Sequence, residues 1–169
     1  LLFSLCKHLF QIGLFLLQNS LRRLVWSSFG GFDLNGLGPL FRLISILLQI
    51  GPRARELAGS MGSPDRISSC ALDEVSDSFD LVINATAASL SSEVPALPES
   101  VFHSQSHAYD LAYADQPTAF MRWALALGAA QAVDGLGMLV EQAAEAFWIW
   151  HRQHPQTAPV ISALRSGAR

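Results

Sequence analysis

Hydrophobic and polar positions form alternating blocks between residues 53 and 169, and these blocks predict strands and helices in turn. The compact apolar run Phe79–Ile83 predicts a buried strand. The segment Ala108–Tyr113 predicts a second strand, whose alternate positions on one face are Tyr109, Leu111 and Tyr113. Strands that alternate with helices are typical of α/β proteins with a parallel sheet.

Helical spacing and helix end signals predict the remaining elements. Thr118 is an oxygen-bearing N-cap for one helix, and the apolar stripe of the longest helix begins after the Asp134-Gly135 pair. A Ser- and Pro-rich loop is expected over residues 89–100. The predicted helical segments are Arg53–Met61, a single turn at Leu72–Val75, Thr118–Leu127, about Asp134–Arg152 and about Val160–Arg165.

The first fifty residues differ from the rest in both composition and pattern. They contain fifteen Leu, six Phe and no Ala, with four basic residues and one acidic residue, whereas residues 51–169 contain twenty-two Ala, seven basic and thirteen acidic residues. No sustained helix or strand period is visible in them. We therefore expect a boundary near residues 50–53, with residues 1–52 an atypical Leu/Phe-rich segment that is truncated, fused or frame-shifted.

A membrane or interfacial role for that segment is the open alternative. The apolar run Leu1–Leu17 is shorter than the roughly 20 residues that a span needs, and it contains Lys7. The second apolar run, Leu40–Ile50, contains Arg42. A membrane association is therefore the less favoured interpretation.

Composition excludes several classes of protein. Of 169 residues, 50% are hydrophobic and 15% are charged, which is unlike a disordered chain. A net charge of −3 provides no electrostatic reason to bind nucleic acid. Cys6 and Cys70 form neither a disulfide framework nor a zinc motif, so a reducing, cytoplasmic location is expected.

Common catalytic signatures are absent from the sequence. It contains no Gly-x-Ser-x-Gly elbow, phosphate-binding loop, His-Glu-x-x-His or Cys-x-x-Cys motif. His103 and His107 lie four apart among Ser and Gln, and solvated side chains explain them better than a metal pair that lacks a third ligand. No metal site is therefore expected.

Two glycines at the start of the longest helix need a physical reason. Gly135 and Gly137 each cost the helix about 1 kcal/mol relative to alanine. Either a ligand approaches the backbone closely, or the helix start packs tightly against a strand; spacing alone leaves both open. Gln142, one turn beyond Met138, could project towards the same ligand, and its uncharged amide suits a hydroxyl-rich substrate.

Four ordered motifs of the chain closely resemble shikimate dehydrogenase. They are Phe79–Thr86, Val94–Pro98, Tyr109–Tyr113 and Ala132–Ala144. The resemblance covers about residues 53–169, the C-terminal part of that family's NADP-binding domain and its final helices. It implies a partial Rossmann-type parallel sheet with flanking helices, preceded here by the atypical apolar segment.

The resemblance also implies roles for individual residues. Leu111 stands where the family usually has a methionine beside the nicotinamide, and an apolar side chain of similar volume still packs there. Arg53 matches an arginine that holds the 2′-phosphate of NADP, although a solvated arginine at a helix start is equally consistent with its surroundings. The implied substrate-binding residues are Tyr113 and Gln142, and the implied cofactor-binding residues are Arg53, Asn84, Thr86, Leu111, Gly135 and Met138.

The sequence also departs from the family pattern. The family's catalytic Lys and Asp, in Asn-Val-Thr-x-Pro-x-Lys and Asn-Thr-Asp motifs, are absent, and the one Lys of the chain is Lys7. The glycine-rich pyrophosphate loop is absent too. Ser89 and Ser92 replace two glycines, which strains the loop if either position requires a positive φ. We therefore expect no catalytic residue in this chain, and little or no activity from it alone.

Three functions follow as hypotheses. The first is an incomplete shikimate dehydrogenase-like oxidoreductase, which reduces 3-dehydroshikimate to shikimate with NADPH in aromatic amino-acid (chorismate) biosynthesis. The alternative is a non-catalytic nucleotide- or partner-binding module with a membrane-associated N-terminus. A third hypothesis keeps the enzyme class but uses quinate or NAD.

Overall fold

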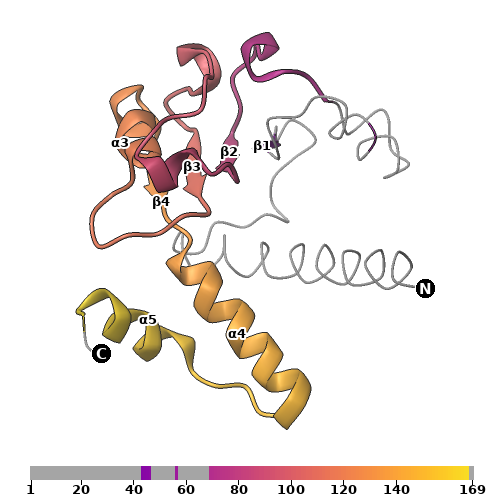
Figure 1. Cartoon of the computed structure of the whole chain (residues 1–169), viewed down its shortest axis with the longest axis vertical. Coiled ribbons are helices and arrows are strands. Elements are labelled where there is room, and N and C mark those ends of the chain that lie inside the picture. The colour runs from indigo at the N-terminus through magenta and orange to yellow at the C-terminus, as the bar shows by residue number, and fades with distance from the viewer. Residues whose placement is uncertain (1–42, 47–55, 57–68, 168–169) are drawn as a thin grey trace. The chain divides into compact units, whose positions relative to one another are not determined.

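A computed structural model of the chain describes residues 43–46, 56 and 69–167. Within them, four parallel strands form one sheet in the order β1-β2-β3-β4 (Figure 1). This arrangement confirms the predicted α/β class. The strands are β1 (Leu43–Ile46), β2 (Leu81–Asn84), β3 (His107–Asp110) and β4 (Gln131–Val133).

The sheet is buried on both faces at its centre. All four residues of β2 are buried. Val82 on β2 and Ala108 on β3, both 0% exposed, belong to the main hydrophobic core on one face. Ile83 and Tyr109 alternate with them and point to the other face, where they are also buried. Burial on both faces is typical of a parallel sheet and explains why the first three residues of β2, Leu81–Ile83, are all apolar.

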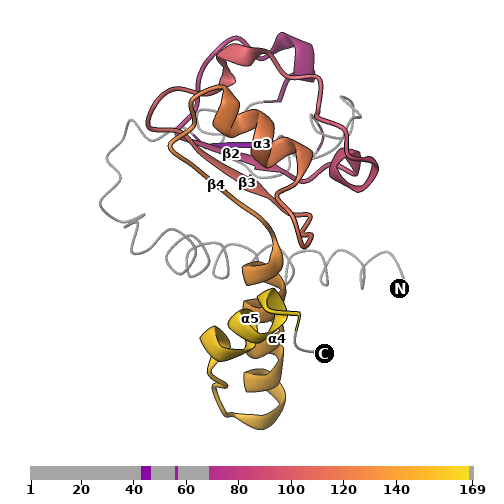
Figure 2. The same cartoon turned by 90° about the vertical axis from the view of Figure 1, so that its left-hand side faces the viewer.

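Helix α3 (Ala119–Ala126) covers the face of the sheet that carries the main core (Figure 2). Thr118 is its N-cap, as predicted, and the Thr118 side chain accepts a hydrogen bond from the Met121 amide. Phe120 and Ala124 point into the core. Phe120 lies 6.3 Å from Phe102 between ring centroids and 5.9 Å from Trp123, so an aromatic cluster fixes this helix to its surroundings.

Two predicted strands have shifted boundaries, for identifiable reasons. Strand β2 begins two residues later than expected, because the Phe79 amide donates to the Val101 carbonyl outside the sheet. Strand β3 ends at Asp110 because the Ala112 amide turns back to the Asp110 side chain. The predicted shared face of Tyr109, Leu111 and Tyr113 is therefore wrong: Tyr109 is buried, and Leu111 and Tyr113 lie beyond the strand.

Two short strands were not predicted. Strand β4 has three half-buried residues, too few for a periodic signal. Strand β1 lies in the segment where no strand period was found, yet it pairs in parallel with β2, with Ile46 opposite Asn84. Residues 43–46 therefore belong to the same sheet as the coherent part of the chain, despite their different composition.

In the part of the chain that the structure describes, three short 3-10 helices lie in the connections. The first, η1 (Leu72–Glu74), is the single helical turn that was predicted. The expected loop over residues 89–100 contains η2 (Ala88–Ser91) at its start and leads into η3 (Glu99–Val101). Of the predicted helix Arg53–Met61, only Glu56 lies within the described residues, and it is helical.

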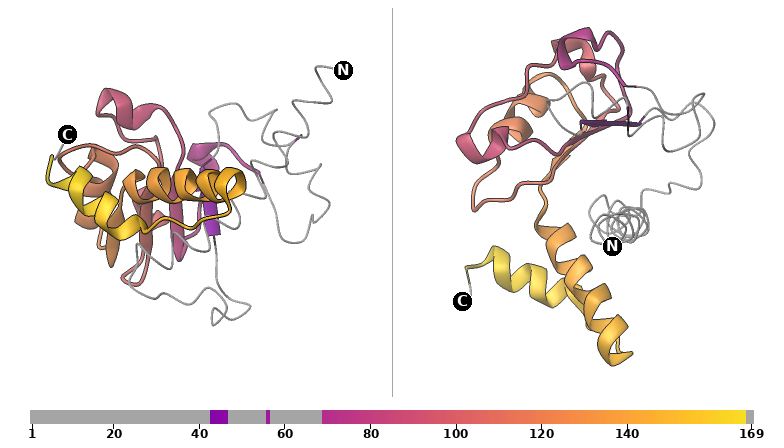
Figure 3. Two further views of the ribbon diagram at one scale, coloured as in Figure 1. Left: turned by 90° about the horizontal axis from the view of Figure 1, so that it is seen from below. Right: turned by 45° about the vertical axis from the view of Figure 1, so that its right-hand side comes forward.

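The described residues divide into two compact units, one that ends at Gly135 and one that begins at Leu136. The described part of the second unit consists of α4 (Leu136–His151) and α5 (Thr157–Arg165), which contact each other (Figure 3). Both helices were predicted, within two or three residues at their starts. Leu136 and Val140 of the α4 stripe are buried, whereas Phe147 and Trp150 are 40% and 77% exposed.

None of the helices in the described ranges combines the length and the apolar character that crossing a membrane requires.

The aromatic cluster under α3 yields a first prediction. Phe120→Ala removes a side chain that is 0% exposed, and we expect it to lower the free energy of unfolding by about 3–5 kcal/mol. Leu125→Ala on the same helix, where the side chain is 48% exposed, is the matched control and should change it by about 0.5 kcal/mol. Urea denaturation followed by tryptophan fluorescence measures both. Equal losses would show that α3 does not pack as described.

Candidate functional site

The carboxyl ends of β2 and β3 bring two polar residues together at one edge of the sheet. Asn84 ends β2 and Asp110 ends β3, and the two are paired in the parallel register. Both side chains are 0% exposed. Open α/β sheets bind their ligands just outside the carboxyl ends of the strands. This edge is therefore the candidate functional site.

Asn84 organises the turn that follows β2. Its side-chain oxygen accepts hydrogen bonds from the Thr86 amide at 3.1 Å and from the Thr86 hydroxyl at 2.8 Å. The Thr86 hydroxyl oxygen in turn accepts a bond from the Ala88 amide at 3.3 Å. Because the Asn84 side chain is fully buried, it shapes the turn from inside, while Thr86 is half-buried at the turn's outer side.

The carboxylate of Asp110 joins the turn after β2 to the loop after β3. Its Oδ1 accepts bonds from the Asn84 side-chain amide at 3.3 Å and from the Ala112 amide at 3.2 Å. Its Oδ2 accepts bonds from the Ser89 and Thr118 hydroxyls, each at 2.6 Å. Four donors from three different segments therefore converge on one buried carboxylate, as burial of such a group requires.

The two serines that replace family glycines behave differently. Ser92 has a φ of +60°, the left-handed region that favours glycine, so the expected strain is present at this position. Ser89 has no positive φ. Its hydroxyl instead accepts a bond from the Asn84 amide at 2.9 Å and donates to Asp110, so this serine adds a connection that glycine could not make.

Gly135 packs directly against the backbone of Leu111. A Cβ atom at Gly135 would lie 2.0 Å from the Leu111 carbonyl oxygen, and the Gly135 amide donates to the Ala112 carbonyl at 3.0 Å. Close packing against the backbone of the loop after β3, rather than against a strand, therefore requires a glycine here. The contact leaves Leu111 half-buried and Tyr113 53% exposed at the same loop.

The structure brings together only part of the predicted site. Asn84, Thr86, Leu111 and Gly135 lie around the carboxyl edge of the sheet, with the exposed side chain of Tyr113 on the loop after β3. Arg53 lies outside the described residues. The remaining two, the half-buried Met138 and the exposed Gln142, are one turn apart on α4 in the other unit.

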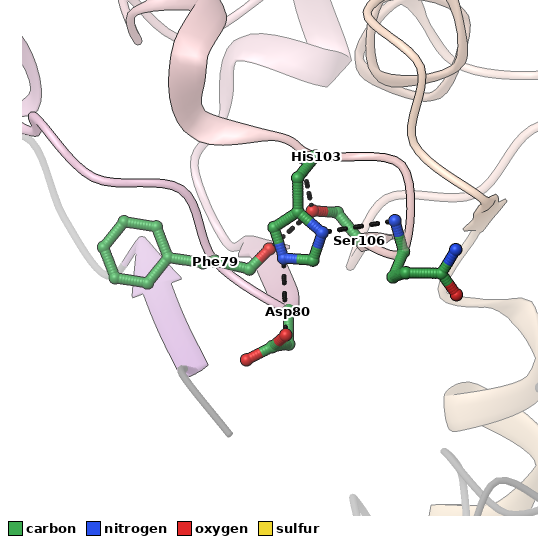
Figure 4. Close-up of polar contacts among 5 residues, drawn as sticks. Phe79, Asp80, His103 and Ser106 are labelled. Atoms are coloured by element: carbon green, nitrogen blue, oxygen red, sulfur yellow. Dashed lines mark hydrogen bonds and ion pairs between the residues drawn. The ribbon is translucent and has the colours of Figure 1, made fainter. Parts of the chain in front are cut away.

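A second polar cluster lies at the opposite, amino edge of the sheet (Figure 4). His103 Nε2 lies 3.3 Å from Asp80 Oδ1, and the Gln105 amide donates to His103 Nδ1 at 3.2 Å. The Ser106 hydroxyl donates to the Phe79 carbonyl at 2.6 Å and is fully buried. A buried hydroxyl in that bond is no nucleophile, so the cluster closes the loop before β3 rather than forming a catalytic triad.

The histidines of this cluster do not form a metal site. Within the described residues, no group of three His, Cys, Asp or Glu side chains could hold a metal ion. Burial lowers the pKa of His107 below its ordinary value of 6.5, and the Asp80 carboxylate partly opposes that effect.

Sequence reasoning assigned no role to Asp110, Ser89 or the site-facing bond of Thr118. A signal was present for Asp110, since it lies within a predicted strand and no Lys or Arg lies between positions 67 and 121 to neutralise it. A carboxylate in that setting must find neutral donors. Which hydroxyls supply them depends on long-range folding that local patterns do not encode.

Comparison with known proteins relates this chain to shikimate dehydrogenases. Residues 135–165 match the family described as "Shikimate 5'-dehydrogenase C-terminal domain". The "Shikimate dehydrogenase (NADP(+))" of Alkalilimnicola ehrlichii is 51% identical over 113 residues, covering 67% of this chain and 42% of that protein. The protein of the same name from Halorhodospira halophila is 47% identical over 154 residues, covering 87% of this chain and 55% of the relative.

A solved shikimate dehydrogenase in complex with NADP+ has a similar structure. It aligns with a TM-score of 0.62 and 25% identity, over 75% of this chain and 47% of that one. The chain thus spans about half the length of the relatives it matches. The Halorhodospira alignment covers about 147 of the 169 residues, so it extends beyond the expected 53–169 into the first fifty-two.

The contact between Gly135 and Leu111 yields a second prediction. Gly135→Ala places a methyl group against a backbone carbonyl, which can move only if β3 or the helix start moves, so we expect a loss of about 1–3 kcal/mol in unfolding free energy. Gly137→Ala, two residues further on in α4, is the control, because alanine is favoured over glycine inside a helix by about 1 kcal/mol. Thermal denaturation compares the two; equal losses would contradict the role given to the Leu111 carbonyl.

The lowered pKa of His107 yields a third prediction. The unfolded chain binds more protons than the folded one between the lowered pKa and 6.5, so stability rises with pH across that window. The contribution is complete above about pH 6.5 and is lost as the pH falls through the folded-state pKa. His107→Gln should flatten the dependence of unfolding free energy on pH there, whereas His154→Gln, at an exposed position, should leave it unchanged. An unaltered slope in His107→Gln would show that this histidine is not the group responsible.

Proposed function

Since the chain is a homologue of shikimate dehydrogenase that matches the NADP-binding region of that family, we propose that it forms the cofactor-binding part of an NADP-dependent shikimate oxidoreductase. The whole reaction is the reversible conversion of 3-dehydroshikimate, NADPH and a proton to shikimate and NADP+. The proposal includes a partial Rossmann-type sheet and a cytoplasmic setting, as expected for such metabolism.

One observation carries the proposal. The turn at Asn84–Thr86, the loop at Leu111–Tyr113 and the backbone of Gly135 all lie at the carboxyl edge of one parallel sheet. This is the edge at which doubly wound folds bind nucleotides. Three segments far apart in the sequence thus meet where the family would place the nicotinamide end of the cofactor.

The described residues suit the nicotinamide end of NADP. Leu111 offers a half-buried apolar side chain for the face of a planar ring, and the Gly135 backbone lies against the backbone of that residue. When bound, NADPH would supply the hydride that 3-dehydroshikimate accepts. Thr86 and the turn held by Asn84 would present polar backbone groups, while Met138 on α4 would add apolar contact. Arg53 remains a candidate for the 2′-phosphate, which a guanidinium binds well.

Tyr113 and Gln142 are the proposed substrate contacts. The Tyr113 side chain is 53% exposed and Gln142 is exposed on α4, so both polar groups are accessible to a ligand. A phenol and an uncharged amide can each donate to and accept from the hydroxyl groups of shikimate or 3-dehydroshikimate. Quinate carries the same kind of groups, so the test below includes it and NAD+.

We further propose that this chain binds these ligands without turning them over. The sequence holds neither family motif that supplies the catalytic Lys and Asp. General acid–base groups typically contribute a factor of about 10²–10⁴ to a rate. A binding module without catalysis therefore remains the alternative for the isolated chain, and the test separates it from the enzyme.

The start of the binding domain is also proposed, and the support is structural. Strand β1 pairs with β2, and the Halorhodospira alignment is longer than residues 53–169. We therefore place the domain boundary before Leu43 rather than near residues 50–53. An atypical or membrane-associated segment, if present, would then be confined to the residues before that strand.

A fourth prediction tests the proposed function. Calorimetric titration of the chain with NADP+, NAD+, shikimate and quinate should detect binding of NADP+ and of shikimate, while no NADPH forms from shikimate and NADP+. Gln142→Ala should weaken shikimate binding about tenfold, the loss expected for one or two hydrogen bonds. Gln153→Ala, which removes an exposed amide just past α4, is the matched control. Absence of binding by every ligand would refute the proposal, and steady NADPH production would refute the inactive state.

A further inference from the structure

We propose that Asp110 is a positioning residue that holds the turn after β2 and the loop after β3 in one fixed register, with Ser89 as its essential partner. The ligands named for these two segments rest on the proposed function above, but the coupling itself rests on the hydrogen bonds of the described residues. Asp110 is 0% exposed, so it acts through its neighbours and touches no ligand.

The two oxygens of the Asp110 carboxylate accept hydrogen bonds from different segments. Oδ1 takes one donor from β2, the Asn84 side chain, and one from the next loop, the Ala112 amide. Oδ2 takes the Ser89 hydroxyl of η2 and the Thr118 hydroxyl at the N-cap of α3. All four donors bond to the one rigid carboxylate of Asp110. If one segment moves and carries this carboxylate with it, the hydrogen bonds to the other segments change as well.

Ser89 closes a ring of hydrogen bonds within this arrangement. Its hydroxyl oxygen accepts from the Asn84 side-chain amide, which also donates to Asp110, and its proton goes to Asp110. The three side chains are thus mutually bonded. Removal of the Ser89 hydroxyl would break two of these three bonds and leave the carboxylate with one donor fewer. Bonds to an ionised group are stronger than neutral ones, so this loss is larger than that of an ordinary hydroxyl.

The register set by Asp110 extends to the proposed ligand contacts. The Leu111 amide donates to the Asn84 carbonyl at 2.9 Å, and the Ala112 carbonyl accepts from the Gly135 amide. The Gly135 backbone in turn lies against the Leu111 carbonyl. The position of Leu111, and of Tyr113 beyond it, therefore depends on a carboxylate that lies beneath both loops.

The chain offers a matched pair of serines for the test. Ser89 and Ser91 both lie in η2, but the Ser91 hydroxyl donates to the Ala88 carbonyl and its side chain is exposed. Ser89→Ala and Ser91→Ala therefore each remove one hydroxyl from the same turn. Thr118→Ser and Thr118→Val form a second pair. Serine keeps the hydroxyl that caps the helix and donates to Asp110, whereas valine keeps the branched shape of threonine without the hydroxyl.

Amide hydrogen exchange, measured by NMR on the unliganded chain, gives the first readout. We expect Ser89→Ala to accelerate exchange about tenfold at Ala112, which lies on the other loop, with Ser91→Ala having no effect there. The Ala129 amide, bonded to the Ala124 carbonyl at the far end of α3, reports global opening and should not change. Thr118→Val should accelerate exchange at Ala112 as well, and Thr118→Ser should restore the slow rate.

Ligand affinity gives the second readout and separates the two proposals. If the chain binds NADP+, Ser89→Ala should weaken that binding by about threefold to tenfold, while Ser91→Ala leaves it unchanged. If the chain binds no NADP+, the proposed function fails, and exchange at Ala112 alone decides the role of Asp110. Unchanged exchange at Ala112 in Ser89→Ala, or an equal rise at Ala112 and Ala129, would overturn the inference, since either result shows no specific link between the loops.

Discussion

The in-register parallel pairing of β2 with β3 is the constraint on which the candidate site depends. It sets Asn84 beside Asp110 at the ends of adjacent strands, and both side chains are completely buried. Burial leaves a carboxylate and an amide with unmet hydrogen-bonding capacity unless nearby donors and acceptors are brought in. A slip of one residue would reverse the faces of every side chain on one strand and would separate this pair.

That requirement explains the shape of the loops that follow. The chain turns sharply after β2 because Thr86 returns to the Asn84 side chain, and β3 ends because Ala112 returns to Asp110. Helix α3 begins at Thr118 for a related reason, since its hydroxyl both caps the helix and donates to Asp110. The strand ends, the turn and the helix start thus all supply hydrogen bonds to the buried side chains of Asn84 and Asp110.

The elements that the sequence could predict are those whose causes are local. Leu81–Ile83 are apolar because both faces of the sheet are buried there, and Thr118 caps α3 through an amide three residues away. Strands β1 and β4 have four and three residues, and their only signal is a partner strand far away in the sequence. Asp110 stood within a recognised motif, but its role depends on Ser89, twenty-one residues earlier, and no local pattern could connect them.

The distribution of titratable groups also limits the chemistry that this sheet can perform. His107 and Asp110 lie at opposite ends of β3, so three steps of about 3.3 Å separate the amino-edge histidines from the carboxyl edge by about 10 Å. His103 and Asp80 are likewise at the amino edge and engaged with each other. At the carboxyl edge, Asp110 is occupied by four donors and lies beneath the surface. Neither the histidines of the amino edge nor Asp110 is therefore placed to exchange a proton with a ligand at the carboxyl edge, where the exposed titratable side chain on the loop after β3 is that of Tyr113.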